Sequence, residues 1–219
     1  MKCFGSNVRL VSKVKYLGVY LDETLNGSEQ ANVVIKKSSS RLAFLYRKAP
    51  LLDRKCRGLL CMALIQPFID YCSSSWYSGL SAQLKGSLDV LQRKMIRFVL
   101  GLDSRSHVDT SHLARIGWLN VKDRVRYFKL IHAFKIYRGS APAYISESFK
   151  NFSSYHSYNT RGSQTNFLVS KNDSSHSIML SSFSYTTKRE WNNLPSGLKG
   201  IISLQLFKSK LREFFLKAY

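Results

Sequence analysis

The sequence is poor in carboxylates and in long apolar runs, and each shortage argues against a class of protein. Only 13 of its 219 residues are Asp or Glu, and the aspartates stand singly, without the adjacent pair typical of two-metal phosphoryl transfer. The longest uncharged apolar stretch, residues 58–69, is too short to cross a bilayer. The first ten residues lack the apolar centre of a signal peptide. We therefore expect an intracellular protein with no polymerase or nuclease centre in this stretch.

Metal-binding and cofactor motifs are also scarce. The sequence contains four cysteines, Cys3, Cys56, Cys61 and Cys72. Their spacings fit neither paired C-x-x-C ligands nor a disulfide framework, so we expect reduced, packed thiols. His107, Asp109 and His112 come nearest to a metal or acid–base cluster, but loop and helix-capping roles are favoured for them. Without a phosphate-binding loop, a nucleophile elbow or a dinucleotide fingerprint, we expect no cofactor and no small-molecule substrate.

Positive charge, in contrast, is abundant. The sequence has 34 Lys and Arg residues and a formal net charge of +21, which favours a polyanionic partner, with RNA and DNA as the first choice. The basic residues gather on the faces of three expected helices. The first face contains Lys37, Arg41, Phe44 and Lys48, the second Arg93, Lys94 and Arg97, and the third Arg124, Arg126, Lys129, Lys135 and Arg138. These faces indicate a protein that clamps the phosphate backbone and recognises nucleic acid by its shape and charge rather than by its bases.

The apolar pattern predicts a mainly α protein: a short N-terminal β-hairpin, a helical bundle, and a less regular tail that ends in a helix. The corresponding units are residues 1–25, 26–138 and 139–219. In the hairpin, strands Val8–Val11 and Val14–Leu21 should meet at Ser12 and Lys13. Helices are expected over residues 28–49, 53–66, 81–100, 111–116, 121–137, 183–191 and 204–215, with a kink at Pro67, a turn at Pro195–Gly197, and weak strands at 165–169 and 177–180.

Aromatic residues are expected mainly in the core. Trp76, Trp118 and Trp191 each stand among apolar neighbours, which favours core anchors over stacking platforms. The cluster of Phe68, Tyr71, Trp76 and Tyr77 is interpreted in the same way.

Several segments, in order, resemble one family. They are KYLGVYLD at 15–22, ALIQPFIDYCSSSW at 63–76, Leu91-Gln92-Arg93 with Arg97, LARIGWLNVKDR at 113–124, Tyr158–Gly162, WNNLP at 191–195, and Phe207 with Leu211. Together they resemble the region that follows the polymerase carboxylates in reverse transcriptases of non-LTR retrotransposons, the LINE and jockey-like elements. The resemblance covers nearly the whole chain.

The resemblance implies a location and a role for each part of the chain. Residues 8–22 would be the primer-grip hairpin, with Lys15, Tyr16 and Gly18 beside the primer, and the following helices would be a thumb holding RNA template and growing DNA. The fingers and palm, with their metal-binding aspartates, would lie upstream and could be a further partner. The chain alone is then expected to be no enzyme, and a nuclear location is implied.

Two alternatives stay open. The first is a non-functional remnant or an interaction module whose apolar hairpin and tail need the palm to fold fully. The second is a basic peripheral membrane protein, because the helix expected from Leu204 to Phe215 is amphipathic. We expect no membrane partner, since nucleic acid accounts better for the charge on three helices.

Overall fold

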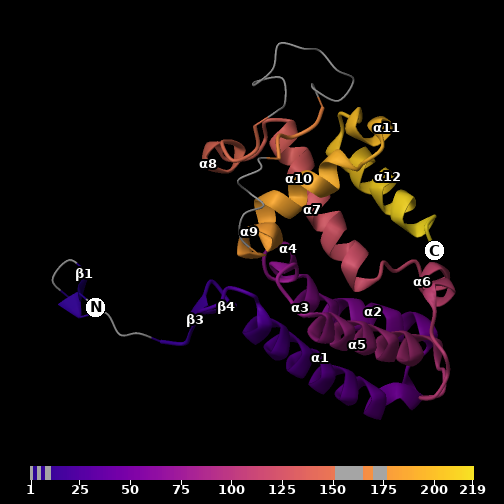
Figure 1. Ribbon diagram of the computed structural model, residues 1–219. Helices are drawn as coiled ribbons and strands as arrows, with labels where there is room; N and C mark the ends of the chain where they lie inside the picture. Colours follow the sequence, from indigo (N-terminus) through magenta and orange to yellow (C-terminus); the bar gives the residue numbers. More distant parts are fainter. Residues whose placement is uncertain (1, 4–5, 8–10, 151–164, 170–176) are drawn as a thin grey trace.

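The chain folds mainly into α-helices, as the sequence predicts. The computed structural model describes residues 2–3, 6–7, 11–150, 165–169 and 177–219, and Figure 1 shows a short hairpin beside the start of a helical body. The fold class expected from the apolar pattern is confirmed.

The hairpin is formed by β3 (Lys13–Tyr16) and β4 (Val19–Asp22), which pair in antiparallel register with Val14 opposite Leu21. Its turn lies at Leu17 and Gly18, where φ is 45° and 87°. Two successive positive φ values match the twist of a two-residue hairpin, and glycine takes such a value without strain. The turn predicted at Ser12 and Lys13 is therefore wrong, because the two strands are joined at Leu17 and Gly18.

A second pair of strands precedes the hairpin and was not predicted. The strands are β1 (Lys2–Cys3) and β2 (Ser6–Asn7). The strand predicted at Val8–Val11 falls largely on residues 8–10, which lie outside the described residues, and Val11 is not in a strand.

The first group of helices follows the hairpin. It contains α1 (Ser28–Lys48), the 3-10 turn η1 (Ala49–Leu51), α2 (Arg54–Leu64), α3 (Gln66–Asp70), α4 (Ser73–Trp76) and α5 (Ala82–Leu100). Asp53 caps α2 by accepting a hydrogen bond from the amide of Cys56 at 2.6 Å, and Gly101 ends α5 in a left-handed conformation. The kink expected at Pro67 is a break at Ile65, with Pro67 in the first turn of α3.

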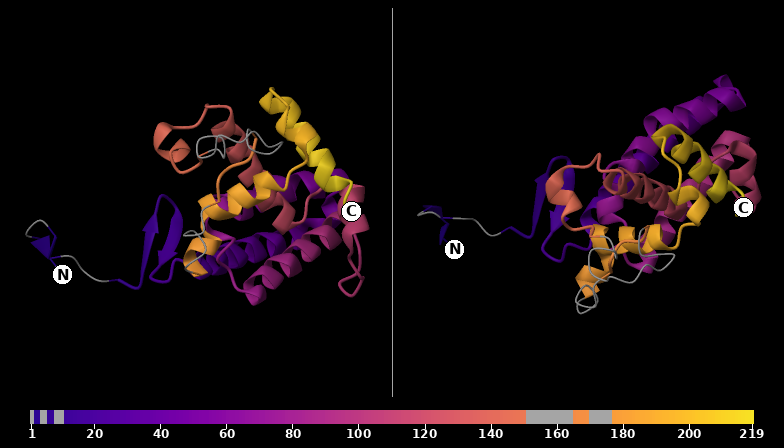
Figure 2. Two further views of the ribbon diagram at one scale, coloured as in Figure 1. Left: turned by 45° about the horizontal axis from the view of Figure 1, so that its top comes forward. Right: turned by 90° about the horizontal axis from the view of Figure 1, so that it is seen from above.

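The second group contains α6 (Thr110–Ile116), α7 (Val121–Tyr137), α8 (Ala143–Ser146), α9 (Ser177–Ser181), α10 (Phe183–Asn192), α11 (Ser196–Lys199) and α12 (Leu204–Leu216). Figure 2 shows α10 and α12 beside α7. The strand predicted at 177–180 is wrong because these residues form α9, and Pro195–Gly197 leads into α11 rather than a simple turn. At 165–169 Phe167 forms only an isolated bridge.

The aromatic predictions hold with one exception. Trp191 is fully buried and Trp76 is 5% exposed, while Trp118 is half-buried against two apolar clusters. Tyr71 is 50% exposed, so the prediction that it lies in the core is wrong. Its hydroxyl is used on the surface instead, where it donates to the carbonyl of Leu17 at 2.6 Å.

Helix α7 belongs to both large apolar clusters. Its residues Val121 and Val125 pack with the α1, α2 and α5 core, whereas Leu130 and Phe134 pack with Trp191 and the rest of the C-terminal core. The terminal helix α12 contributes Phe207, Leu211 and Phe215 to that second core. These three side chains of the apolar face are packed inside the protein, whereas Leu206 and Phe214 on the same helix are exposed.

Lys129 lies at the middle of α7 and is 4% exposed. Its Nζ donates to the hydroxyl of Ser78, before α5, at 2.5 Å and to that of Thr186, in α10, at 2.7 Å. Burial lowers the pKa of Lys129 from its ordinary value of 10.5 to about 8. This lysine therefore joins the two groups of helices, at the cost of burying a charge.

Because the Lys129 charge is costly to bury, replacing Lys129 should change how the free energy of unfolding depends on pH. Between pH 8 and 10.5 the unfolded chain keeps the Lys129 proton and the folded chain loses it, so folding gains stability as the pH rises. We expect the free energy of unfolding of wild type, relative to Lys129→Met, to rise by about 3 kcal/mol across this window. Urea unfolding at several pH values measures it.

The comparison with the variant isolates Lys129. Burial also raises the pKa of Tyr77 and of Cys61 to about 12, but both groups are present in each protein and cancel in the difference. The exposed Lys48→Met variant is the control and should show a flat difference. A flat difference for Lys129→Met as well would contradict a desolvated lysine.

Candidate nucleic-acid interface

The hairpin presents Lys15, Tyr16 and Gly18 to solvent, with Tyr16 63% exposed. Tyr71 supports the tip of the hairpin through its bond to Leu17, and its ring lies 3.4 Å from the position that a Cβ on Gly18 would take. Lys15 extends its ammonium group toward the ring of Tyr20, 5.9 Å from the ring centre. The tip is thus fixed on the helices while its side chains stay available.

The first basic face lies on α1, where Lys37, Arg41, Phe44 and Lys48 are all exposed, as the helical spacing predicts. Lys37 reaches over the ring of Phe68 at 5.9 Å, so this face lies toward α3. The only carboxylate of α1, Glu29, pairs with Lys13 at 2.9 Å. Among the described residues, no carboxylate forms an ion pair with the three cations of the α1 face.

The second basic face, on α5, divides into two parts. Arg93 and Lys94 are exposed and line a groove against α1, whereas Arg97 is half-buried and donates from Nε to the carbonyl of Ser106 at 2.9 Å. The groove takes Ile35 and Ser39 from α1, which lie on a different flank from the α1 face. The structure therefore presents two basic surfaces on either flank of α1, not one continuous face.

The third basic face is engaged within the protein. Arg124 donates two hydrogen bonds to Asp70, from Nε at 2.5 Å and from Nη2 at 2.6 Å. Arg126 bonds to Asp123 and Glu190, and Arg138 donates to the carbonyl of Ile201. Lys129 is buried as well, so four of the five cations of this face have partners within the protein. The fifth, Lys135, is half-buried and forms no ion pair among the described residues.

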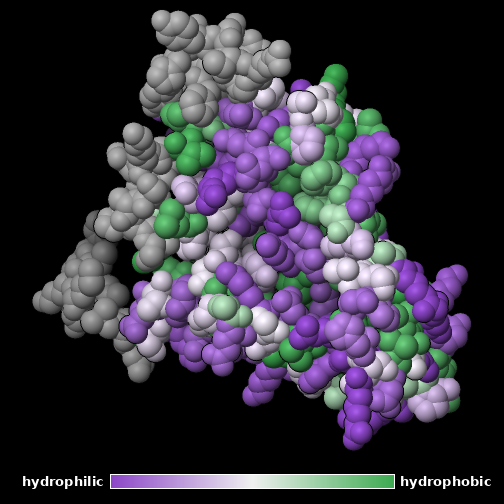
Figure 3. All heavy atoms as spheres, turned by 45° about the vertical axis from the view of Figure 1, so that its right-hand side comes forward, coloured by the Kyte–Doolittle hydropathy of each residue, from purple (hydrophilic) through white to green (hydrophobic). Residues whose placement is uncertain are grey.

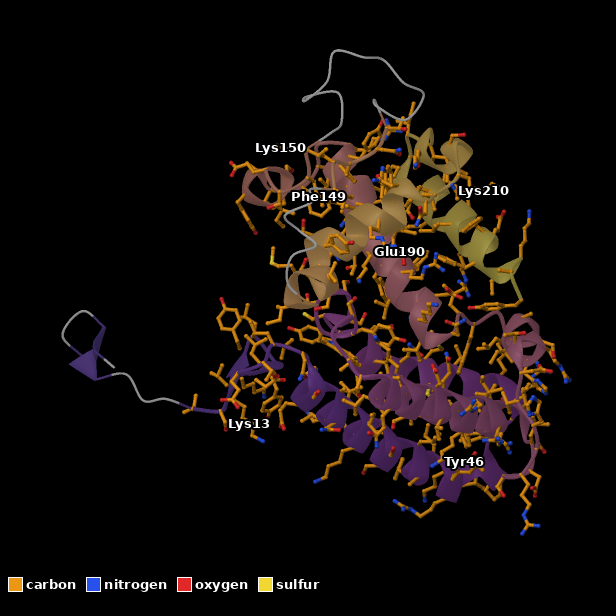
Figure 4. The ribbon with its side chains drawn as sticks, in the orientation of Figure 1. Lys13, Tyr46, Phe149, Lys150, Glu190 and Lys210 are labelled. Carbon is orange, nitrogen blue, oxygen red and sulfur yellow. The ribbon has the colours of Figure 1, made fainter. Side chains whose placement is uncertain are left out.

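Charged and apolar side chains alternate over the surface of the helical body. Figure 3 shows hydrophilic side chains over much of one face, interrupted by small hydrophobic patches. Figure 4 places Glu190 between α10 and α7, where it meets Arg126.

Several residues of the segments singled out in the sequence analysis connect parts of the chain that are far apart in sequence. Asp70 and Arg124, from two of these segments, form the ion pair just described. Gln92 donates from Nε2 to the carbonyl of Leu119 at 2.8 Å and accepts from the amide of Val121 at 3.1 Å. Near the C-terminus, Trp191 donates from Nε1 to the carbonyl of Thr165 at 2.8 Å. These side chains fix the fold, and the sequence spacing alone gave no sign of these partners.

Of His107, Asp109 and His112, the last two cap a helix, and His107 lies in the loop before it. Asp109 accepts from the amides of Ser111 and His112 at the start of α6, and His112 completes a capping box. Hydrogen bonds to the Asp109 carboxylate, first from the hydroxyl of Ser111 and second from the side chain of His112, hold the pKa of Asp109 well below its ordinary value. No group of three or more His, Cys, Asp and Glu among the described residues could hold a metal ion.

Within the described part of the chain, no helix is long and apolar enough to cross a membrane. No family model, no curated protein and no solved structure matches the chain.

The Asp70–Arg124 pair allows a direct test of its structural role. Asp70→Asn leaves the half-buried Arg124 guanidinium without a counter-charge, and we expect the free energy of unfolding to fall by about 2–3 kcal/mol. The exposed Lys13–Glu29 pair is the control, because Glu29→Gln should cost under about 1 kcal/mol. Urea unfolding measures both, and equal losses would contradict the role assigned to Asp70.

Proposed function

We propose that the chain binds nucleic acid through its phosphates, as the thumb and tail region of a non-LTR retrotransposon RNA-directed DNA polymerase. The observation that carries the proposal is the set of exposed cations on α1 and α5, which form no ion pair with a carboxylate among the described residues. Asp89, one turn before Arg93 on α5, is the carboxyl that Arg93 influences most directly. Lys37, Arg41 and Lys48 supply the first surface, with Phe44 between them. Arg93 and Lys94 supply the second.

In this proposal the partner is an RNA/DNA template–primer duplex. The cations of α1 and α5 hold the phosphates, and the hairpin tip, with Lys15 and Tyr16 exposed, lies at the primer end. Binding requires no metal and no small molecule, and the chain on its own is no enzyme. The polymerase resemblance adds a nuclear location to the proposal.

The apolar surface of the hairpin supports a second candidate function, an interaction module that docks on the fingers and palm region. Val14, Tyr16 and Leu17 are 51%, 63% and 75% exposed. Adjacent exposed apolar residues on an edge hairpin are typical of a protein contact. In this candidate the chain has little affinity for nucleic acid by itself.

A salt series with an RNA/DNA hybrid separates the two candidates. Each phosphate contact adds about 0.9 to the slope of log affinity against log salt. We expect Lys37→Gln/Arg41→Gln to lower the slope by about 2. Fluorescence anisotropy between 50 and 200 mM salt measures the slope.

The matched control loses the same charge on a different helix. Lys210→Gln/Lys217→Gln removes two exposed lysines of the α12 region, and Figure 4 shows Lys210 well apart from the lower helices. This variant should keep the wild-type slope. Equal slopes for all three proteins would contradict the α1 surface, and wild type with no slope but with binding of an apolar dye would favour the interaction module.

A further inference from the structure

A groove with a volume of 440 Å³ runs between α1 and α5, on the flank of α1 opposite to the Lys37 face. Its walls include Ile35 and Ser39 from α1, and Gly86, Val90, Arg93 and Lys94 from α5. The size is in the range of ligand sites. No carboxylate lines the groove, so an anion can enter it without repulsion from its walls.

Gly86 lies inside α5, where glycine destabilises a helix relative to alanine. The fold does not require it, because a Cβ at this position would meet no atom within 4 Å. By contrast, a Cβ on Gly27 would lie 2.6 Å from the carbonyl oxygen of Trp76. A bare backbone that opens on a groove suits the close approach of another backbone.

An aromatic ring continues the groove beyond Lys94. Tyr46 lies on the same flank of α1 as Ile35 and Ser39, eleven and seven residues after them, and is 43% exposed. Its hydroxyl donates to the carbonyl of Lys94 at 3.1 Å, and its ring packs edge-on against Phe98 with 5.0 Å between the centres. The ring is thus held in place against the backbone of α5 at Lys94, and Figure 4 shows Tyr46 on the lower helices.

We propose that this groove binds a single-stranded stretch of nucleic acid. Phosphates contact Arg93 and Lys94, the sugar–phosphate backbone passes over Gly86, and one base stacks on Tyr46. A single strand fits because its bases are free to stack on a side chain, whereas those of a duplex already stack on one another. The apolar side chains of Ile35 and Val90 meet the sugars and base edges. This inference rests on the proposed function and names a second, separate surface for it.

The test measures two ligands with the same set of variants, a labelled oligo(dT) and an RNA/DNA hybrid. Gly86→Gln fills the groove without changing the charge. We expect it to weaken oligo(dT) binding about tenfold, to change hybrid binding less than twofold, and to raise the melting temperature by about 2–4 °C. The gain in stability shows that the loss of binding does not come from unfolding.

Substitutions of Tyr46 separate stacking from stability. Tyr46→Leu removes the ring and should weaken oligo(dT) binding about tenfold, while Tyr46→Phe keeps the ring and should bind within about twofold of wild type. Lys37→Gln should affect the hybrid more than oligo(dT). Equal losses of both ligands in Gly86→Gln, or no loss of oligo(dT), would overturn the inference.

The outcomes also distinguish this inference from the proposed function. If wild type binds the hybrid with a salt slope but Gly86→Gln leaves oligo(dT) unchanged, only the groove is refuted. If wild type binds neither ligand, the proposed function fails as well. Competition by polyglutamate as strong as that by oligo(dT) would make the groove a site for acidic peptides and would overturn the inference too.

Discussion

The structure depends on helix α7, which packs in two hydrophobic cores at once. Val125 lies in the first core, and Leu130, five residues later, lies in the second. A helix buried on more than one side must satisfy the charges that it carries, and α7 does so through Asp70, Glu190 and two hydroxyls. The ion pair of Arg124 with Asp70 holds α3 against α7, and Lys129 holds α10 against the residues before α5.

This constraint divides the positive charge of the chain into two kinds. The arginines of α7 are matched to carboxylates or carbonyl oxygens inside the protein, and their geometry is fixed. The cations of α1, such as Arg41 and Lys48, have no such partner among the described residues. The net charge of +21 is therefore not available for binding in equal measure on every helix, because the arginines of α7 are paired within the protein, whereas the cations of the α1 face form no ion pair among the described residues. The proposed binding surfaces are those where the charge remains uncompensated by the fold.

The helices could be predicted because their signals are local. Apolar spacing, the cap at Asp53 and the terminator at Gly101 lie within a few residues of the ends that they define. The hairpin turn was placed wrongly because Leu17 takes a left-handed conformation that its residue type disfavours. The strand predicted at 177–180 failed because a short apolar run fits a helix or a strand equally well.

The candidate site was less predictable, because contacts between distant parts of the chain decide which cations are paired and which stay exposed. Helical spacing correctly grouped Lys37 with Lys48, but nothing local separates these residues from Arg124, whose partner is 54 residues away. Tyr46 and Gly86 gave no sequence signal at all, since a groove exists only once α1 and α5 are packed. Several of the segments that carry the resemblance contribute side chains that join the fold, such as Asp70 and Arg124.

The most direct measurement is hydrogen exchange of the backbone amides with and without a bound RNA/DNA hybrid. The account predicts that the bound hybrid slows amide exchange along α1 and α5 and at the hairpin tip. Exchange in α9 to α12 should stay unchanged. Protection confined to α10 and α12, or spread evenly over the chain, would contradict a binding surface made by the uncompensated cations of α1 and α5.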